Sequence, residues 1–196
     1  MTMDFNDAGP QRSLDIIPAD TIATVHLIIR PGKAGEGGWL RRAKDGASEA
    51  LDCEFVVVDG EYAKRRFWSL FTVAGTTEGH AKATRISHGY LRAILECARN
   101  IRPDDTGETA KRARRPESWG DFDGLRFIAR IGIEPAKGEY KSKNVLLEVI
   151  TPDRKEWHPV DQVPKPAGGT AAPQQASAPA VPAATTPAIV RPAWAK

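Results

Sequence analysis

Hydrophobic and polar residues alternate in five segments of the chain, which is the pattern of β-strands that bury one face. In residues 21–30, Ala23, Val25, Leu27 and Ile29 all fall on the same side. The same alternation recurs in residues 51–59, 62–73, 125–133 and 140–150. The dipeptide Asp59-Gly60, between the second and third segments, predicts a tight hairpin turn. The chain is therefore predicted to be mainly β.

Strand alternation also predicts which side chains face a core, because successive residues point to opposite faces. Beyond the first strand, the predicted inward set is Cys53, Phe55, Val57, Phe67, Phe71, Val73, Leu125, Phe127, Ala129, Ile131, Ile133, Val145, Leu147 and Val149. Arg66 and Trp68 then point outward from the third strand, on the face opposite Phe67.

The period of the pattern changes between residues 77 and 99, where apolar side chains recur every three or four positions. That spacing predicts an amphipathic helix, which Thr76 or Thr77 would cap. Residues 102–121 are polar and are expected to form a loop. The resulting order β-β-β-α-β-β is that of the OB-fold, a partly open five-stranded Greek-key barrel. We therefore expect a five-stranded OB-like barrel over residues 1–162, with one helix between strands 3 and 4.

The last part of the chain, residues 163–196, has a different composition, rich in Pro and Ala. Such a segment buries too little apolar surface to offset its ordering entropy, which predicts a disordered tail. Apolar residues return in residues 189–196. This tip either binds a partner protein or is a sticky end without function.

Composition narrows the class of protein. Apolar residues make up 41% and charged residues 27% of the 196-residue chain, which are globular values. No run approaches a membrane span, and the first residues lack the apolar region of a secretory signal. Cys53 and Cys97 lie within apolar segments, which favours buried, reduced thiols and a cytoplasmic protein. The oligomeric state stays open.

The net charge of +3 comes from the tail, which has Lys165, Arg191 and Lys196 and no acid. The body, residues 1–162, is formally neutral, but residues 60–130 carry 14 Lys/Arg against 9 Asp/Glu. A nucleic-acid contact would therefore depend on a local basic patch and not on a global field.

Several stretches together resemble a phage and prophage family that is catalogued as a domain of unknown function. They are GWL-x-R-x-KDG (38–46), LDCEFVVVDGEYAKRRFW (51–68), GTTEGHAKA (75–83), DFDGLRFIARIGIEP (121–135) and YKSKNVLLEVITPD (140–153). The resemblance implies an OB-type, single-stranded-DNA-binding protein of phage replication and recombination modules, in the cytoplasm of a bacterial host. The tail departs from the acidic tails of many single-strand binders, because it is basic.

Cations and aromatic rings together are what a single-strand binder needs, since cations grip phosphates and rings stack on bases. The predicted nucleic-acid contacts are Lys64, Arg66, Trp68, Arg126, Arg130, Tyr140, Lys141 and Lys143, together with Trp39, Arg41 and Arg42 from the loop between the first two strands. Two alternatives stay open: Trp68 packs under the loop of residues 32–38, or Trp39 only anchors its own loop. The run from Lys111 to Arg115 is a charge run of the solvated kind.

Other functions have weaker support in the residues. Asp104, Glu139 and Lys141 form only a short pattern of the metal-dependent nuclease type, and the four histidines lack zinc-like spacing. We therefore predict a protein that is not an enzyme and has no cofactor or metal. Its expected partners are single-stranded DNA and, through the tail, replication or recombination proteins. The alternative is a non-catalytic adaptor whose barrel binds another protein of a phage replication complex.

Overall fold

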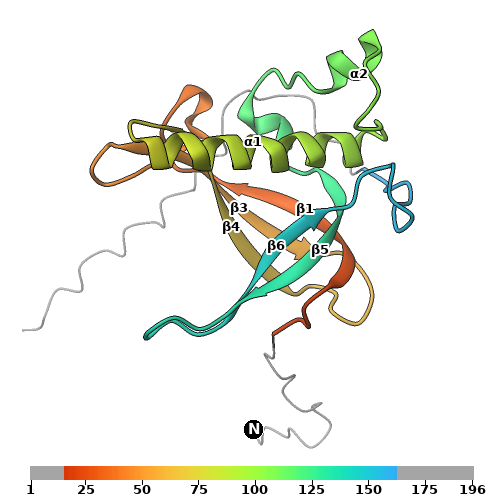
Figure 1. Ribbon diagram of the computed structural model, residues 1–196, viewed down its shortest axis with the longest axis horizontal. Coiled ribbons are helices and arrows are strands. Elements are labelled where there is room, and N and C mark those ends of the chain that lie inside the picture. Colours follow the sequence, from red (N-terminus) through yellow and green to blue (C-terminus); the bar gives the residue numbers. More distant parts are fainter. Residues whose placement is uncertain (1–15, 163–196) are drawn as a thin grey trace, which may run out of the picture.

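The computed structural model describes residues 16–162 (Figure 1). Its strands are β1 (Thr21–Arg30), β2 (Arg41–Arg42), β3 (Ser48–Val57), β4 (Arg66–Gly75), β5 (Arg126–Glu134) and β6 (Lys143–Val149). Its helices are α1 (Glu78–Ala98) and α2 (Glu108–Ala113), with the short 3-10 turns η1 (Glu36–Gly38) and η2 (Trp119–Phe122). The mainly β prediction is confirmed. The described residues contain six strands where five were expected, because the two-residue β2 is an addition. The predicted tail, residues 163–196, lies outside the described residues.

The strands form one antiparallel sheet in the order β4-β3-β1-β5-β6, and β2 pairs with the start of β3. The first strand is thus in the middle, with β3 on one side and β5 on the other. The two end strands, β4 and β6, curve round until they contact each other. Within residues 16–162, β4 and β6 are not paired by backbone hydrogen bonds.

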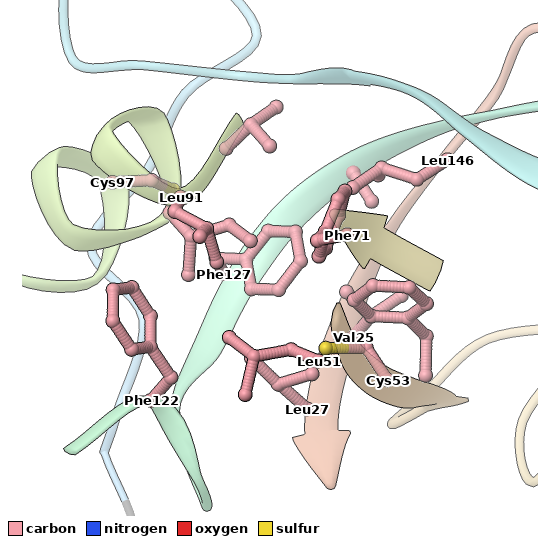
Figure 2. Close-up of a cluster of buried hydrophobic side chains, with 14 of the residues drawn as sticks. Val25, Leu27, Leu51, Cys53, Phe71, Leu91, Cys97, Phe122, Phe127 and Leu146 are labelled. Carbon is pink, nitrogen blue, oxygen red and sulfur yellow. The ribbon is translucent and has the colours of Figure 1, made fainter. Parts of the chain in front are cut away.

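The core lies inside this curved sheet and is closed by α1, which crosses one end of the strands (Figure 1). Thr77 caps the helix, since its Oγ1 accepts a hydrogen bond from the His80 backbone N at 3.1 Å. Leu91 and Cys97 of α1 point toward Phe127 of β5 (Figure 2). Phe55 stacks on Phe67 at a centroid distance of 5.0 Å. Alternation therefore predicted most inward residues of β1, β3 and β5 correctly, but the prediction for Ile133 is wrong, because this residue near the end of β5 is exposed.

Both cysteines are free and buried in this core, as the sequence indicated. Burial raises the pKa of the Cys53 thiol and that of the Cys97 thiol. Cys97 Sγ also accepts a hydrogen bond from the Ile128 backbone N at 3.3 Å. These thiols are packing groups and stay protonated at neutral pH.

The connection between β3 and β4 is longer than the predicted two-residue turn. Residues 58–65 form it, and the Lys64 backbone N donates to the Val57 carbonyl at 2.8 Å. Lys64 adopts a left-handed backbone conformation, with a φ of 69°. The prediction that Lys64 belongs to the strand is wrong, because this left-handed residue ends the turn before the strand begins at Arg66.

A β-bulge in β6 overturns another prediction. Arg130 of β5 pairs with Glu148, whereas Ile131 pairs with Leu146, so Leu147 has no partner across the ladder. Leu147 is exposed instead of inward, and Leu146 is buried in its place. The Leu147 carbonyl accepts a hydrogen bond from the Tyr90 hydroxyl of α1 at 2.9 Å. A bulge shifts the alternation by one residue, so a strict period of two fails after it.

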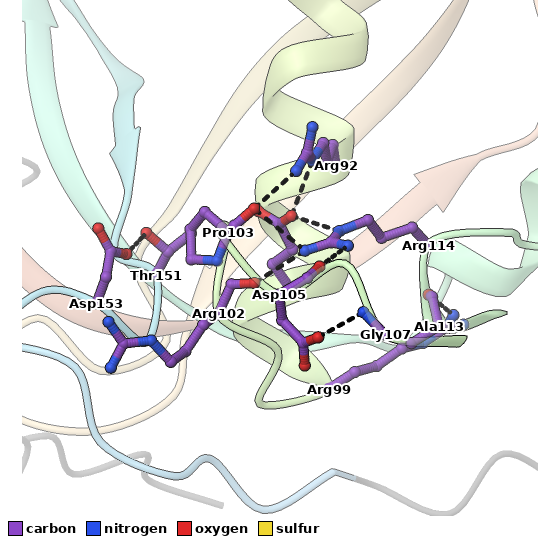
Figure 3. A network of polar contacts seen from close by, with 11 residues as sticks. Arg92, Arg99, Arg102, Pro103, Asp105, Gly107, Ala113, Arg114, Thr151 and Asp153 are labelled. Atoms are coloured by element: carbon purple, nitrogen blue, oxygen red, sulfur yellow. Dashed lines mark hydrogen bonds and ion pairs between the residues drawn. The ribbon is translucent and has the colours of Figure 1, made fainter. Parts of the chain in front are cut away.

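Residues 102–121, which were expected to be a loop, contain α2 and η2 and are fastened to α1. Glu96 of α1 is buried and accepts hydrogen bonds from Arg92 Nε at 2.8 Å and Arg114 Nε at 2.6 Å. Arg114 Nη2 also donates to the Arg102 carbonyl at 2.8 Å (Figure 3). Within the basic run from Lys111 to Arg115, Arg114 is thus a structural anchor, and only Lys111, Arg112 and Arg115 are exposed to solvent.

Candidate nucleic-acid interface

A groove of about 510 Å³ lies where the two end strands of the sheet meet α1. Its lining includes Trp68, Leu70 and Thr72 of β4, Ile86 and Tyr90 of α1, Glu134 and Lys143 at the hairpin end of β5 and β6, and Arg41 and Asp52. A smaller hollow continues from it and is lined by Ile16, Arg66, Trp68, Lys143 and Asn144, among others. The groove exists because β4 and β6 contact each other without pairing along their length.

Trp68 is the aromatic side chain of this groove. Alternation places it on the face opposite Phe67, and 46% of its surface is exposed. Its position across from Glu54 in the β3–β4 register allows its Nε1 to donate to Glu54 Oε2 at 3.3 Å. One edge of the indole is therefore held while much of the ring stays open to solvent. The alternative in which Trp68 is covered by the loop of residues 32–38 does not describe this structure.

The cations around Trp68 already have carboxylate partners. Arg66 Nη1 contacts Glu54 Oε1 at 2.7 Å, and this same carboxylate holds Trp68. Two further pairs of the groove are Arg41 with Asp52, at 3.2 Å, and Lys143 with Glu134, at 2.9 Å. The groove thus combines positive and negative groups in nearly equal number. A phosphate that binds there must compete with a carboxylate for each of these cations.

Four of the predicted contact residues come together in the groove and its adjoining hollow: Arg41, Arg66, Trp68 and Lys143. Arg42 lies beside Arg41 on β2 and pairs with Glu49 at 2.7 Å, outside the groove lining. Tyr140 and Lys141 lie in the connection of the β5–β6 hairpin, which projects away from α1 (Figure 1). Both are exposed and stay predicted contacts, but neither lines the groove.

Arg126 and Arg130 of β5 do not belong to the groove. Arg130 is 24% exposed in its side chain and pairs with Glu148 at 3.1 Å and with Glu156 at 3.5 Å. Arg126 is fixed at its backbone, where Gln162 accepts from its N at 2.9 Å and donates to its O at 2.8 Å. These contacts hold Arg130 and the backbone of Arg126 against β6 and the segment after it, and neither residue lines the groove, although both stay predicted contacts.

Trp39 is buried and does not line the groove. It is only 2% exposed, and a Cβ added to Gly120 would lie 2.7 Å from its indole ring. The ring therefore packs against η2 and anchors its loop, which was the alternative interpretation of this residue. A buried ring cannot stack on a base without local rearrangement.

The sequence interpretation missed the acids of the interface, Asp52 and Glu54, and its apolar members Leu70, Ile86 and Tyr90. A signal for the acids was present, because alternation in β3 sends Asp52 and Glu54 outward once Cys53 and Phe55 point inward. Their partners on β2 and β4 were not visible without the strand register.

Within residues 16–162, no group of three or more His, Cys, Asp or Glu side chains is placed to hold a metal ion. In the same part of the chain, no helix has the length and apolar character needed to cross a membrane. No protein-family model and no curated protein matches the sequence. The resemblance to the phage family therefore stays a prediction.

Proposed function

We propose that this protein binds single-stranded DNA through the groove between β4 and β6, as an OB-type protein of phage or prophage replication and recombination. The OB-type barrel is supported by the central position of the first strand and by the contact between the two end strands. A curved sheet whose end strands meet incompletely is a partly open barrel. The protein acts in the cytoplasm without a cofactor and without catalysing a reaction.

The observation that carries the proposal is the exposed ring of Trp68 in a groove bordered by Arg66 and Lys143. A base stacks on the indole face, which contributes about 1–3 kcal/mol per base and is tolerant of sequence. The neighbouring phosphates take over Arg66 and Lys143 from Glu54 and Glu134. Exposed ion pairs of this kind contribute about 0–1 kcal/mol each, so the exchange costs little.

A titration with dye-labelled oligo-dT tests the proposal through fluorescence anisotropy. We expect salt-sensitive binding by the unaltered protein and a loss of about 5- to 150-fold in Trp68→Ala, from the stacking energy of one base. Ile133→Ala is the control, because it removes an exposed apolar side chain that lines neither the groove nor the adjoining hollow and is not a predicted contact. No binding by the unaltered protein, or equal binding by Trp68→Ala, would refute the proposal.

The second candidate function is a non-catalytic adaptor, and the apolar character of the same region favours it. Leu70 is 57% exposed and Ile86 is 54% exposed, on opposite walls of the groove. Exposed apolar side chains beside paired charges are typical of a surface that binds a protein. In that case residues 163–196 would serve as a tether to replication or recombination proteins.

The two functions are distinguished by Leu70→Ser combined with Ile86→Ser. An adaptor should recover a stoichiometric protein partner from nuclease-treated infected cells and lose it in the double variant, and neither protein should bind oligo-dT. If the protein binds DNA, the unaltered protein should bind oligo-dT, and no stoichiometric protein partner should be recovered.

A further inference from the structure

The solvent-facing side of α1 carries a row of cations that the groove does not include. Lys82, Arg85, Gly89 and Arg92 follow one another at spacings of three, four and three residues. That spacing places them on one stripe of a helix. All four are exposed, and we call them the α1 stripe.

The charges of the α1 stripe differ from those of the groove. Lys82 and Arg85 have no ion-pair partner among residues 16–162, whereas Arg41, Arg66 and Lys143 of the groove each have one. The only acids of α1 are Glu78 in its first turn and Glu96, which is buried. Arg92 pairs with Glu96, so the uncompensated positive charge of the stripe is that of Lys82 and Arg85.

Gly89 has no structural reason to be glycine. It lies inside α1 with ordinary helical geometry, and a Cβ built there would meet nothing within 4 Å. Glycine in a helix interior lowers stability relative to alanine. The missing side chain leaves a low point between Arg85 and Arg92, one helical turn from each.

The α1 stripe is continuous with the groove. Ile86 lines the groove and, together with Gly89, Tyr90 and Leu147, it also lines a shallow hollow between α1 and β6. Lys82 lies one turn before Ile86 on the helix, at the same border. A DNA strand that leaves the groove past Ile86 reaches Gly89 first. It then reaches Arg85 and Arg92, the cations on either side of Gly89.

We propose that the α1 stripe is a second nucleic-acid contact, where the backbone of the bound single strand crosses α1 at Gly89 and its phosphates contact Lys82 and Arg85. This inference rests on the function proposed above. Unpaired cations without a stacking ring fit a phosphate backbone, and the glycine allows that backbone to approach the helix closely. Bases are held in the groove, and phosphates are held on the stripe.

Salt-dependent binding of two oligo-dT lengths tests this path. For a strand of about 20 nucleotides, Lys82→Gln with Arg85→Gln should reduce the slope of log affinity against log salt by about 1.4, from two phosphate contacts. Between about 50 and 200 mM salt, that is about a sevenfold smaller loss of affinity. A strand of about 6 nucleotides, which fills only the groove, should bind the variant and the unaltered protein alike.

Two further variants separate the path from general electrostatics. Arg112→Gln with Arg115→Gln removes two exposed charges from the α2 region and should change the slope for the long strand much less. Gly89→Gln should raise the melting temperature, because it removes a helix-interior glycine, and yet weaken the long strand by blocking its approach.

The outcomes assign each failure to one proposal. If neither strand binds the unaltered protein, the proposed function fails. If Trp68→Ala weakens both strands while Lys82→Gln with Arg85→Gln leaves the slope unchanged, the groove stands and the α1 stripe is refuted. Equal slopes in the α1 and α2 double variants, or a stabilised Gly89→Gln with unaltered binding of the long strand, also refute the stripe.

Discussion

Glu54 occupies the centre of the candidate interface, because its two carboxylate oxygens hold Arg66 and Trp68 separately. Glu54→Gln removes the negative charge and keeps the size of the side chain. Its amide oxygen can still accept from Trp68 Nε1. Its NH2 group then faces Arg66. Because both groups are hydrogen-bond donors, no hydrogen bond forms between them and the guanidinium becomes free. The substitution thus frees one groove cation and leaves the stacking ring in place.

The magnitude follows from the exposure of the pair. The side chain of Arg66 is 58% exposed, so the ion pair contributes only about 0.5 kcal/mol to folding. We expect the free energy of unfolding to fall by about that amount. The affinity for oligo-dT should rise by about two- to fivefold, since a phosphate no longer competes with a carboxylate. The slope of log affinity against log salt should stay about the same, since Arg66 contacts a phosphate in both proteins.

The assay is a salt series of anisotropy titrations, with urea denaturation of the same samples. Glu49→Gln is the matched control, because it makes the same charge change on the same strand and releases Arg42, which is 61% exposed but lies outside the groove lining. Glu49→Gln should change the affinity clearly less. Equal gains in both variants would reduce the effect to net charge. Unchanged or weaker binding by a folded Glu54→Gln would refute the groove as a phosphate site.

Three further predictions concern the framework of the site. Glu96→Gln should lower the free energy of unfolding by about 3 kcal/mol, because it breaks a buried ion pair. Asp104→Asn, which breaks an exposed ion pair, should lower it by less than about 1 kcal/mol. Urea denaturation measures both values, and equal losses would contradict the prediction. Tyr90→Phe should lose about 1 kcal/mol with its hydrogen bond to the Leu147 carbonyl, and an unchanged urea midpoint would speak against that bond. Burial, and then the charge of Arg126, lower the pKa of His26 below its ordinary value of 6.5. The unfolded chain therefore takes up the proton first, so stability should fall as pH drops below about 6.5, and His26→Gln should flatten this slope in urea titrations between about pH 5 and pH 8.

The periodic patterns of the sequence determined the long strands and the long helix, but not β2, α2 or η2. Alternation in residues 21–30 predicted β1 with its bounds, and the change of period predicted α1 to within one residue at each end. These signals depend only on residues that are close along the chain. Successive side chains of a strand point to opposite faces, and side chains three or four positions apart in a helix share one face. The outward position of Trp68, given Phe67 inward, belongs to the same class of inference.

Contacts between distant residues decided the rest. The left-handed Lys64, the bulge at Leu147 and the burial of Trp39 against Gly120 break local patterns in favour of packing or backbone hydrogen bonds. Whether a cation is free or paired depends on the register between strands, as for Arg66 and Glu54. The sequence by itself thus determined which side chains face outward from β1, β3 and the middle of β4. Only the tertiary structure decided which of them meet, because the distances that govern charge and stacking arise when β4, β6 and α1 come together.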